Sequence, residues 1–196
     1  GLAATPLLVL AAKDGGRYAV PALAIFAASM ILLYGASTTY HTFNISEKVN
    51  KVLRKIDHMM IFILIAGSYT PICVIPLRDT VGIPLLILVW AVAIAGMLIK
   101  AFWITCPKWF SSTIYIAMGW LCVLAMVPLV QTLPTAAFIW LVAGGVIYTI
   151  GGVIYALKLP LFNAEHQYFG SHEIFHVFVM AGSLCHYVTM FYIAKM

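Results

Sequence analysis

Long apolar segments follow one another along the whole chain, and short stretches with charged residues, proline or glycine separate them. A helix that crosses the ~30 Å hydrocarbon core of a bilayer needs about 20 mostly apolar residues, which is close to the length of these segments. The pattern therefore predicts an all-α integral membrane protein with a bundle of seven transmembrane helices. The predicted helices cover residues 1–12, 18–43, 55–76, 81–103, 111–131, 135–157 and 170–194.

The first predicted helix is shorter than the others. It contains 12 residues before Lys13, Asp14 and Gly15, and a helix of that length rises only about 18 Å. Because this length cannot cross the hydrocarbon core, we expect the first helix to be truncated in this chain and to continue about ten residues upstream of Gly1.

Composition supports a membrane protein and excludes a soluble fold. Of the 196 residues, 64% are apolar and only 9% are charged, against roughly 45–50% and about 25% in soluble domains. So few charges cannot cover a surface of this size, and most of the surface must face lipid. The connections are short and no repeat is found, so residues 1–196 are predicted to form a single transmembrane domain.

The basic residues predict the orientation of the bundle. The net charge of +5 could indicate a nucleic-acid partner, but four of the 11 basic residues lie in segment 48–55 between two apolar runs, as in a cytoplasmic loop. With a cytoplasmic N-terminus, the inner side carries seven basic residues and the outer side four, so we expect the C-terminus outside and no nucleic-acid partner. The inner set is Lys48, Lys51, Arg54, Lys55, Lys100, Lys108 and Lys158, and the outer set is Lys13, Arg17, Arg78 and Lys195.

Glycines, prolines and cysteines are interpreted as packing positions. The pairs Gly144-Gly145 and Gly151-Gly152 predict a close approach of helix 135–157 to a neighbour. Four prolines lie within or near the apolar runs, where membrane helices accommodate them as kinks. The four cysteines form no C-x-x-C pair, so we interpret them as small buried residues rather than as disulfides or metal ligands. These residues are Pro21, Pro71, Pro84 and Pro128, and Cys73, Cys106, Cys122 and Cys185.

Ionisable residues inside apolar helices need a partner or a ligand, because a charge in hydrocarbon costs several kcal/mol. The candidates concentrate at the end of helix 18–43, the start of helix 55–76 and the start of helix 170–194. In an alternating topology these three ends all lie on the cytoplasmic side, so we expect their polar residues to converge. They are His41, Asp57, His58, His172, Glu173 and His176, with His186 deeper in the last helix.

This convergence predicts a zinc site. His172 and His176 are four residues apart, which places both rings on one helical face about 6 Å apart along the axis, and His41 could supply a third nitrogen. Three neutral imidazoles suit Zn²⁺ and leave the fourth tetrahedral position to water, as in a catalytic site. Asp57 would accept that water's proton as general base, and Ser37, one turn before His41, would hold the water or the substrate oxygen.

Most of these residues also have a purely structural interpretation. An H-x-x-x-H pair can be two interfacial histidines that hydrogen-bond lipid head groups, and Ser37 can bond to a carbonyl of its own helix. For His58 and Glu173 we expect solvation at the interface, since they point about 100° away from Asp57 and His172.

Two further polar residues lie deeper in the helices. His186 is about 15 Å beyond His176 along the helix, so it cannot join the same metal centre and is interpreted as a packed histidine. Ser68 lies on nearly the same face as Asp57, about 16 Å deeper. It either lines an interior cavity or packs between helices.

The spaced motifs resemble the hemolysin III proteins, the bacterial branch of the progestin and adipoQ receptor family. The motifs are STTYH at 37–41, DHMMIFILIAGSYTP at 57–71 and SHEIFHVF at 171–178. The resemblance covers nearly the whole chain and extends to membrane hydrolases of the alkaline ceramidase type. It implies a seven-helix protein with a zinc ion near the cytoplasmic leaflet, bound at His41, His172 and His176, with Asp57 and Ser37 near the zinc-bound water.

The favoured hypothesis is a zinc-dependent hydrolase of the cell (inner) membrane that cleaves the amide or ester of a lipid and serves membrane-lipid homeostasis. The alternative is a non-enzymatic membrane-state sensor or cytolysin, in which zinc only holds two helices together. An ion channel is disfavoured because the interior positions show no ring of repeated polar residues. The residue pattern leaves the lipid, turnover itself and the oligomeric state open.

Overall fold

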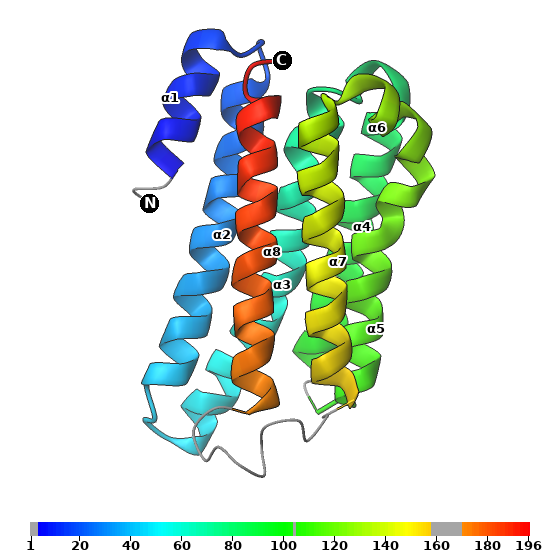
Figure 1. The fold of residues 1–196 in the computed structure, drawn as a ribbon. Helices are drawn as coiled ribbons and strands as arrows, with labels where there is room; N and C mark the ends of the chain where they lie inside the picture. Colours follow the sequence, from blue (N-terminus) through cyan, green and yellow to red (C-terminus); the bar gives the residue numbers. More distant parts are fainter. Residues whose placement is uncertain (1–3, 104, 158–169) are drawn as a thin grey trace.

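The computed structural model describes residues 4–103, 105–157 and 170–196, and within these residues the chain forms a bundle of helices with no strand (Figure 1). A π-helical turn, Arg78–Gly82, precedes α4, and a 3₁₀ stretch, Trp120–Ala125, connects α5 to α6. The α-helices are α1 (Ala4–Asp14), α2 (Ala19–Thr42), α3 (Glu47–Val74), α4 (Ile83–Phe102), α5 (Lys108–Gly119), α6 (Met126–Thr132), α7 (Thr135–Leu157) and α8 (Ser171–Ile193).

The prediction of an all-α, seven-helix membrane bundle is confirmed. Six segments in the described part of the chain are long and apolar enough to cross a membrane, and the first predicted segment is the 11-residue helix α1, which packs against α2. Large apolar side chains cover the outer surface, where Phe102 is 89% exposed and Val127 is 67% exposed. Such a surface suits lipid rather than water. The spans are Ala19–Thr42, Glu47–Val74, Arg78–Phe102, Trp109–Thr132, Thr135–Leu157 and Ser171–Ile193.

Helix α3 begins at Glu47, well before the predicted position 55. The Ser46 hydroxyl caps it by accepting a hydrogen bond from the Val49 N–H at 3.3 Å, and Glu47 places a negative charge in the first turn. The prediction was wrong because it followed the apolar run, which starts after two charged helical turns. As a result Asp57 lies about three turns inside α3 rather than at its start.

The predicted helix 111–131 is broken in its middle. Helix α5 ends at Gly119, and the 3₁₀ stretch follows before α6 begins. The Tyr69 hydroxyl of α3 pairs the backbone at the break: it donates to the Gly119 carbonyl at 2.6 Å and accepts from the Cys122 N–H at 2.8 Å. Irregular backbone at membrane depth is tolerated where such partners satisfy it.

The prolines kink fewer helices than predicted. Pro21, Pro84 and Pro128 each lie in the first turn of their helix, where the missing N–H has no helical partner to lose. Pro71 alone of the four lies in a helix interior, that of α3. Because Pro128 cannot continue the hydrogen bonding of a preceding helix, it also contributes to the break before α6.

Helices α7 and α8 lie side by side along most of their length (Figure 1). A Cβ atom added at Gly144 would collide with the His186 ring, and one added at Gly151 would collide with Phe178. The predicted close approach of helix 135–157 to a neighbour is therefore present, and the neighbour is α8. Gly145 has open space around it, so it takes no part in this approach.

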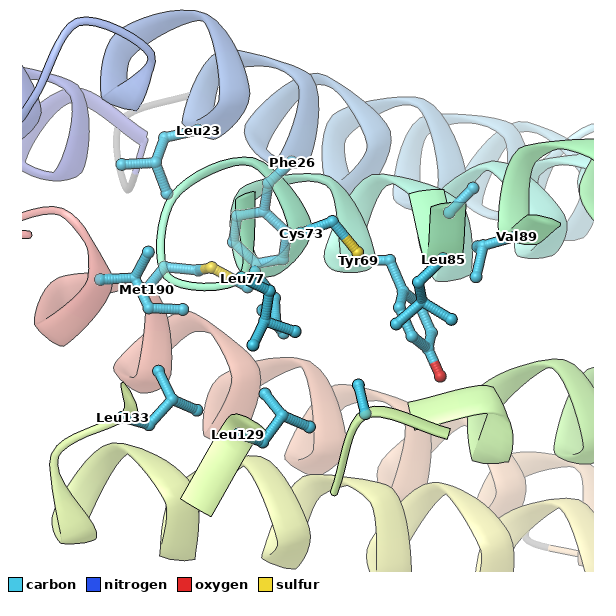
Figure 2. Packing of buried hydrophobic residues seen from close by; sticks show 14 of the residues in the cluster. Leu23, Phe26, Tyr69, Cys73, Leu77, Leu85, Val89, Leu129, Leu133 and Met190 are labelled. Atoms are coloured by element: carbon cyan, nitrogen blue, oxygen red, sulfur yellow. The ribbon is translucent and has the colours of Figure 1, made fainter. Parts of the chain in front are cut away.

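A dense apolar core fills the end of the bundle at which α2 begins and α8 ends (Figure 2). Side chains from α2, α3, α4, α6 and α8 meet there, and Cys73 is fully buried among them, as interpreted from the sequence. The polar residues singled out in the sequence lie toward the other end. Prominent core members are Leu23, Phe26, Leu77, Leu85, Val89, Leu129 and Met190.

Candidate metal centre and interior cavity

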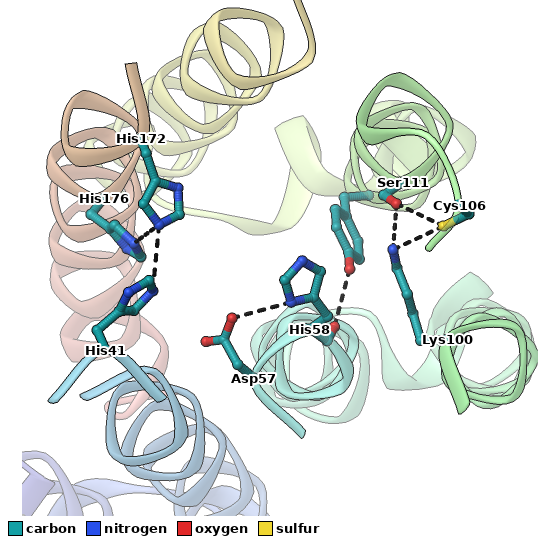
Figure 3. Close-up of polar contacts among 9 residues, drawn as sticks. His41, Asp57, His58, Lys100, Cys106, Ser111, His172 and His176 are labelled. Atoms are coloured by element: carbon teal, nitrogen blue, oxygen red, sulfur yellow. Dashed lines mark hydrogen bonds and ion pairs between the residues drawn. The ribbon is translucent and has the colours of Figure 1, made fainter. Parts of the chain in front are cut away.

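Three histidine rings meet at the end of the bundle opposite the apolar core (Figure 3). His41 comes from the last turn of α2, and His172 and His176 come from the first two turns of α8. The Nε2 atom of His172 lies 3.2 Å from Nε2 of His176 and 3.4 Å from Nε2 of His41. One ligand atom of each histidine lies within 4.8 Å of those of the other two. The structure thus brings together the three residues that the helix ends and the i,i+4 spacing indicated.

This donor set fits a tetrahedral zinc ion. Zinc–nitrogen bonds of about 2.0–2.1 Å place two ligand nitrogens roughly 3.3–3.4 Å apart, close to the two separations observed. A ring nitrogen carries either a hydrogen or a lone pair, so His172 Nε2 cannot donate to one neighbour and accept from the other. A cation among the three nitrogens removes this conflict.

Local structure fixes the start of α8, which carries two of the rings. The Glu173 carboxylate accepts a hydrogen bond from the Gly170 N–H at 2.8 Å, and this satisfies one of the free donors at the helix N-terminus. Glu173, expected to be solvated at the interface, is partly exposed and in addition caps this helix. Tyr155 of α7 packs beside His172 with ring centroids 5.9 Å apart. Together these contacts orient the first turn of α8.

Asp57 faces the same region but contacts its neighbour His58 (Figure 3). Its Oδ2 lies 3.2 Å from His58 Nδ1, and the two side chains are 10% and 14% exposed. The expected separation of Asp57 from His58 is wrong, because the 100° step describes the backbone direction and the imidazole turns back toward the carboxylate. The Tyr115 hydroxyl donates to the His58 carbonyl at 3.1 Å and further fixes this turn. His58, for which the sequence favoured solvation at the interface, is instead largely buried beside Asp57, and its Nδ1 makes no hydrogen bond within the described residues.

An interior cavity of about 220 Å³ continues from this polar end into the bundle. Asp57, His172 and His176 line it at the polar end, and apolar side chains such as Leu85 and Leu129 line it near the core. A largely apolar cavity with a few polar groups at one end is typical of a site for a molecule with an apolar body and a polar head.

The two serines singled out in the sequence both line this cavity. The Ser68 hydroxyl donates a hydrogen bond to the Leu64 carbonyl of its own helix at 2.8 Å. Within the described residues the Ser37 hydroxyl makes no hydrogen bond, so the alternative of a bond to its own helix is not realised. Ser37 therefore offers a hydroxyl to whatever occupies the cavity.

A second polar cluster joins the end of α4 to the start of α5 (Figure 3). Cys106 Sγ lies 3.1 Å from Lys100 Nζ and 3.2 Å from Ser111 Oγ, and Lys100 also donates to Ser111. Burial alone would raise the pKa of the Cys106 thiol, but the hydrogen bonds from Ser111 and Lys100 and the lysine charge lower the pKa below its ordinary value. Cys106 is buried, as predicted, but it contacts polar side chains rather than only apolar ones. Lys100, which was expected in a cytoplasmic loop, is buried.

Comparison with known proteins agrees with this architecture. A family model described as Haemolysin-III related matches residues 2–187. The hemolysin-3 homolog of Bacillus subtilis is 36% identical over 190 residues, which cover 96% of this chain and 85% of that protein. Hemolysin-3 of Bacillus cereus is 37% identical over 188 residues, which cover 95% of this chain and 82% of that protein. The adiponectin receptor protein of Drosophila melanogaster is 26% identical over 176 residues, which cover 80% of this chain and 39% of that protein.

Proposed function

This chain belongs to the Haemolysin-III related family of multi-pass membrane proteins, and we propose that it is a zinc-dependent hydrolase of the cell (inner) membrane that cleaves a lipid amide or ester. The observation that carries the proposal is the convergence of three histidine nitrogens at the polar end of an apolar cavity. Such a cavity suits an acyl chain, and the polar end suits the carbonyl group to which the chain is attached.

The metal would be bound by the three clustered histidines, His41, His172 and His176. A zinc ion there would polarise a carbonyl and lower the pKa of water in its open position. His172 and His176 also line the cavity, so a metal held there would be close to a substrate group in the cavity.

The remaining polar side chains have separate roles in the proposed reaction. Asp57, mostly buried at the polar end of the cavity, accepts the proton of the attacking water. The Asp57 carboxyl group then returns this proton to the departing nitrogen or oxygen of the lipid. Ser37 donates its hydroxyl hydrogen to the carbonyl oxygen of the lipid.

A second candidate is a non-enzymatic membrane-state sensor or cytolysin with a structural zinc. The observation in its favour is that the three rings come from only two helices, α2 and α8, so that an ion among them joins those helices. The Tyr34 hydroxyl of α2, which donates to Ser183 of α8 at 2.7 Å, is a second link between them. In this case Asp57 is dispensable and the histidines are not.

The decisive test is incubation of the purified full chain with a panel of lipid amides and esters, with products detected by mass spectrometry. Asp57→Asn keeps the size of the side chain but removes its proton acceptor, so turnover should fall by about 10²–10⁴-fold while zinc content is unchanged. The matched control is Asp79→Asn, which makes the same chemical change at an exposed carboxylate in the turn before α4. It should retain wild-type turnover.

Three outcomes would contradict parts of the proposal. A zinc-loaded protein that cleaves no lipid of the panel would favour the sensor or cytolysin. Equal turnover in Asp57→Asn and wild type would remove the general-base role. Loss of zinc from Asp57→Asn would instead make Asp57 a ligand or an anchor of a ligand.

A further inference from the structure

Lys100, in the last turn of α4, is a buried cation that is only 3% exposed. Its ammonium group donates to Cys106 Sγ at 3.1 Å and to Ser111 Oγ (Figure 3). Within the described part of the chain, no carboxylate lies at ion-pair distance from it. A buried charge without a counter-ion is costly. The group that can carry the balancing negative charge at this place is the Cys106 thiol.

Cys106 lies in the connection between α4 and α5, outside the long apolar segments, and is 8% exposed. Although burial opposes ionisation, the hydrogen bonds from Ser111 and Lys100 and the lysine charge lower the pKa of this thiol below its ordinary value. The thiolate is the nucleophilic form of cysteine, and thiolates beside a lysine are the ones that peroxides oxidise most readily.

The contacts of Cys106 also decide which group an oxidised sulfur would meet. A sulfenic acid condenses with a thiol or with a nitrogen that lies against it. Within the described residues, the polar groups in contact with Cys106 Sγ are the Lys100 nitrogen and the Ser111 hydroxyl, and the four cysteines form no disulfide. The structure therefore offers the sulfur an amine rather than a second thiol.

We propose that Lys100 and Cys106 form an oxidative modification site, at which hydrogen peroxide converts the pair into a covalent sulfur–nitrogen link between α4 and the connection to α5. The link would replace a buried charge with a neutral bond and fix this connection to the end of α4. Neither the metal nor the lipid of the proposed function takes part in this reaction, so the two proposals stand or fail independently.

The reaction has two steps. In the first, the Cys106 thiolate attacks one oxygen of the peroxide and the O–O bond breaks. The sulfur loses two electrons and becomes a sulfenic acid, while the departing hydroxide takes a proton from the Lys100 ammonium group and leaves as water. In the second, the resulting amine attacks the sulfur, the S–N bond forms and the S–O bond breaks, and the hydroxyl group leaves with one amine hydrogen as a second water. Burial of both side chains keeps bulk water from hydrolysing the product.

Treatment of the purified full chain in detergent with hydrogen peroxide, followed by mass spectrometry, tests this site. Digestion at acidic residues leaves Lys100 and Cys106 on one peptide. The mass of that peptide should fall by the mass of two hydrogen atoms, and a thiol reductant should restore it. Dimedone, which traps sulfenic acids, should label Cys106 and reduce the linked fraction when it is present during oxidation. These measurements use the wild-type chain, so they are informative even if a substitution prevents folding.

Three variants assign the link to the two residues. Lys100→Arg keeps the positive charge beside the thiol, but a guanidinium group does not lose its proton, so the reaction should stop at the sulfenic acid that dimedone traps. Cys106→Ser should show neither the link nor a label at this position. A disulfide between Cys106 and Cys122 would cause the same loss of mass, since both lie on the same peptide. Cys122→Ala is therefore the matched control and should keep the link.

Three results would overturn the proposal. If peroxide changes neither the peptide mass nor the dimedone labelling of Cys106 in wild type, the cluster does not react. If dimedone labels Cys106 but no peptide loses two hydrogen atoms, Lys100 does not capture the sulfur. If Lys100→Arg still loses them, or Cys122→Ala does not, another group is the partner of the oxidised sulfur. None of these results bears on zinc content or on lipid turnover, which test the proposed function separately.

Discussion

The ring nitrogens of His41, His172 and His176 lie as close together as the ligands of one ion. We therefore expect about one zinc ion per purified chain, since three imidazoles form one tetrahedral site. The double variant His172→Ala, His176→Ala should lose the metal, as measured by elemental analysis. His186→Gln, ten residues farther along α8, should keep it. Zinc that persists in the double variant would exclude this cluster as the binding site.

Single residues were predictable where the helix period alone decides their neighbours. His172 and His176 are four residues apart, and that spacing directs both rings to one face. The contact of Asp57 with His58 was not predictable in this way, because it depends on how the His58 side chain turns within a packed interior. The environment of Cys106 depends on Lys100, which the fold brings close across the end of α4.

Among the elements, the apolar runs predicted how many helices exist better than where each begins or breaks. The start of α3 depends on the Ser46 cap, which lies outside the apolar run. The break after α5 depends on the Tyr69 hydroxyl, which comes from another helix. A capping residue such as Ser46 can be recognised in the local sequence if capping positions are considered. A contact with a residue of another helix, such as Tyr69, cannot be recognised there.

The break between α5 and α6 makes a prediction for Tyr69. Tyr69→Phe removes the hydroxyl that donates to the Gly119 carbonyl and accepts from the Cys122 N–H, so each of these backbone groups loses a hydrogen bond. We expect a loss of about 1–3 kcal/mol in the free energy of unfolding, measured by thermal or denaturant unfolding in detergent. Tyr192→Phe, at an exposed tyrosine, is the control and should change stability little. Equal stability of Tyr69→Phe and wild type would show that other partners satisfy the break.

The interface of α7 with α8 predicts opposite effects for two adjacent glycines. Gly144→Ala introduces a methyl group where the His186 ring lies, so it should destabilise the protein by about 1–3 kcal/mol. Gly145→Ala meets open space and should be neutral or stabilising by about 0.5–1 kcal/mol, since alanine favours helix over glycine. Melting temperatures of the two variants in the same detergent provide the comparison. Similar losses in both would indicate that α7 needs glycine for another reason than this contact.

The whole molecule has two different ends. The apolar core closes the end at which α2 begins and α8 ends, whereas the histidine cluster, Asp57 and the buried Lys100 lie toward the other end. Six long apolar segments in the described part of the chain agree with the number of complete spans predicted. Helix alternation placed the polar residues at one end because consecutive spans must reverse direction. Which end faces the cytoplasm is a separate question, and charge alone addresses it.

The connection between α2 and α3 leads into the basic segment 48–55, so it should lie in the cytoplasm, and the zinc site with it. The test uses two exposed, uncharged positions at opposite ends of the bundle: Ile45 in that connection and Thr135 at the start of α7. In intact cells, an impermeant thiol reagent should label Thr135→Cys above the background of the native cysteines and should leave Ile45→Cys unlabelled until the membrane is permeabilised. Neither substitution changes a charge, so neither should alter the orientation itself. Labelling of Ile45→Cys alone in intact cells would reverse the topology, and the histidine cluster would then act on lipids of the outer leaflet.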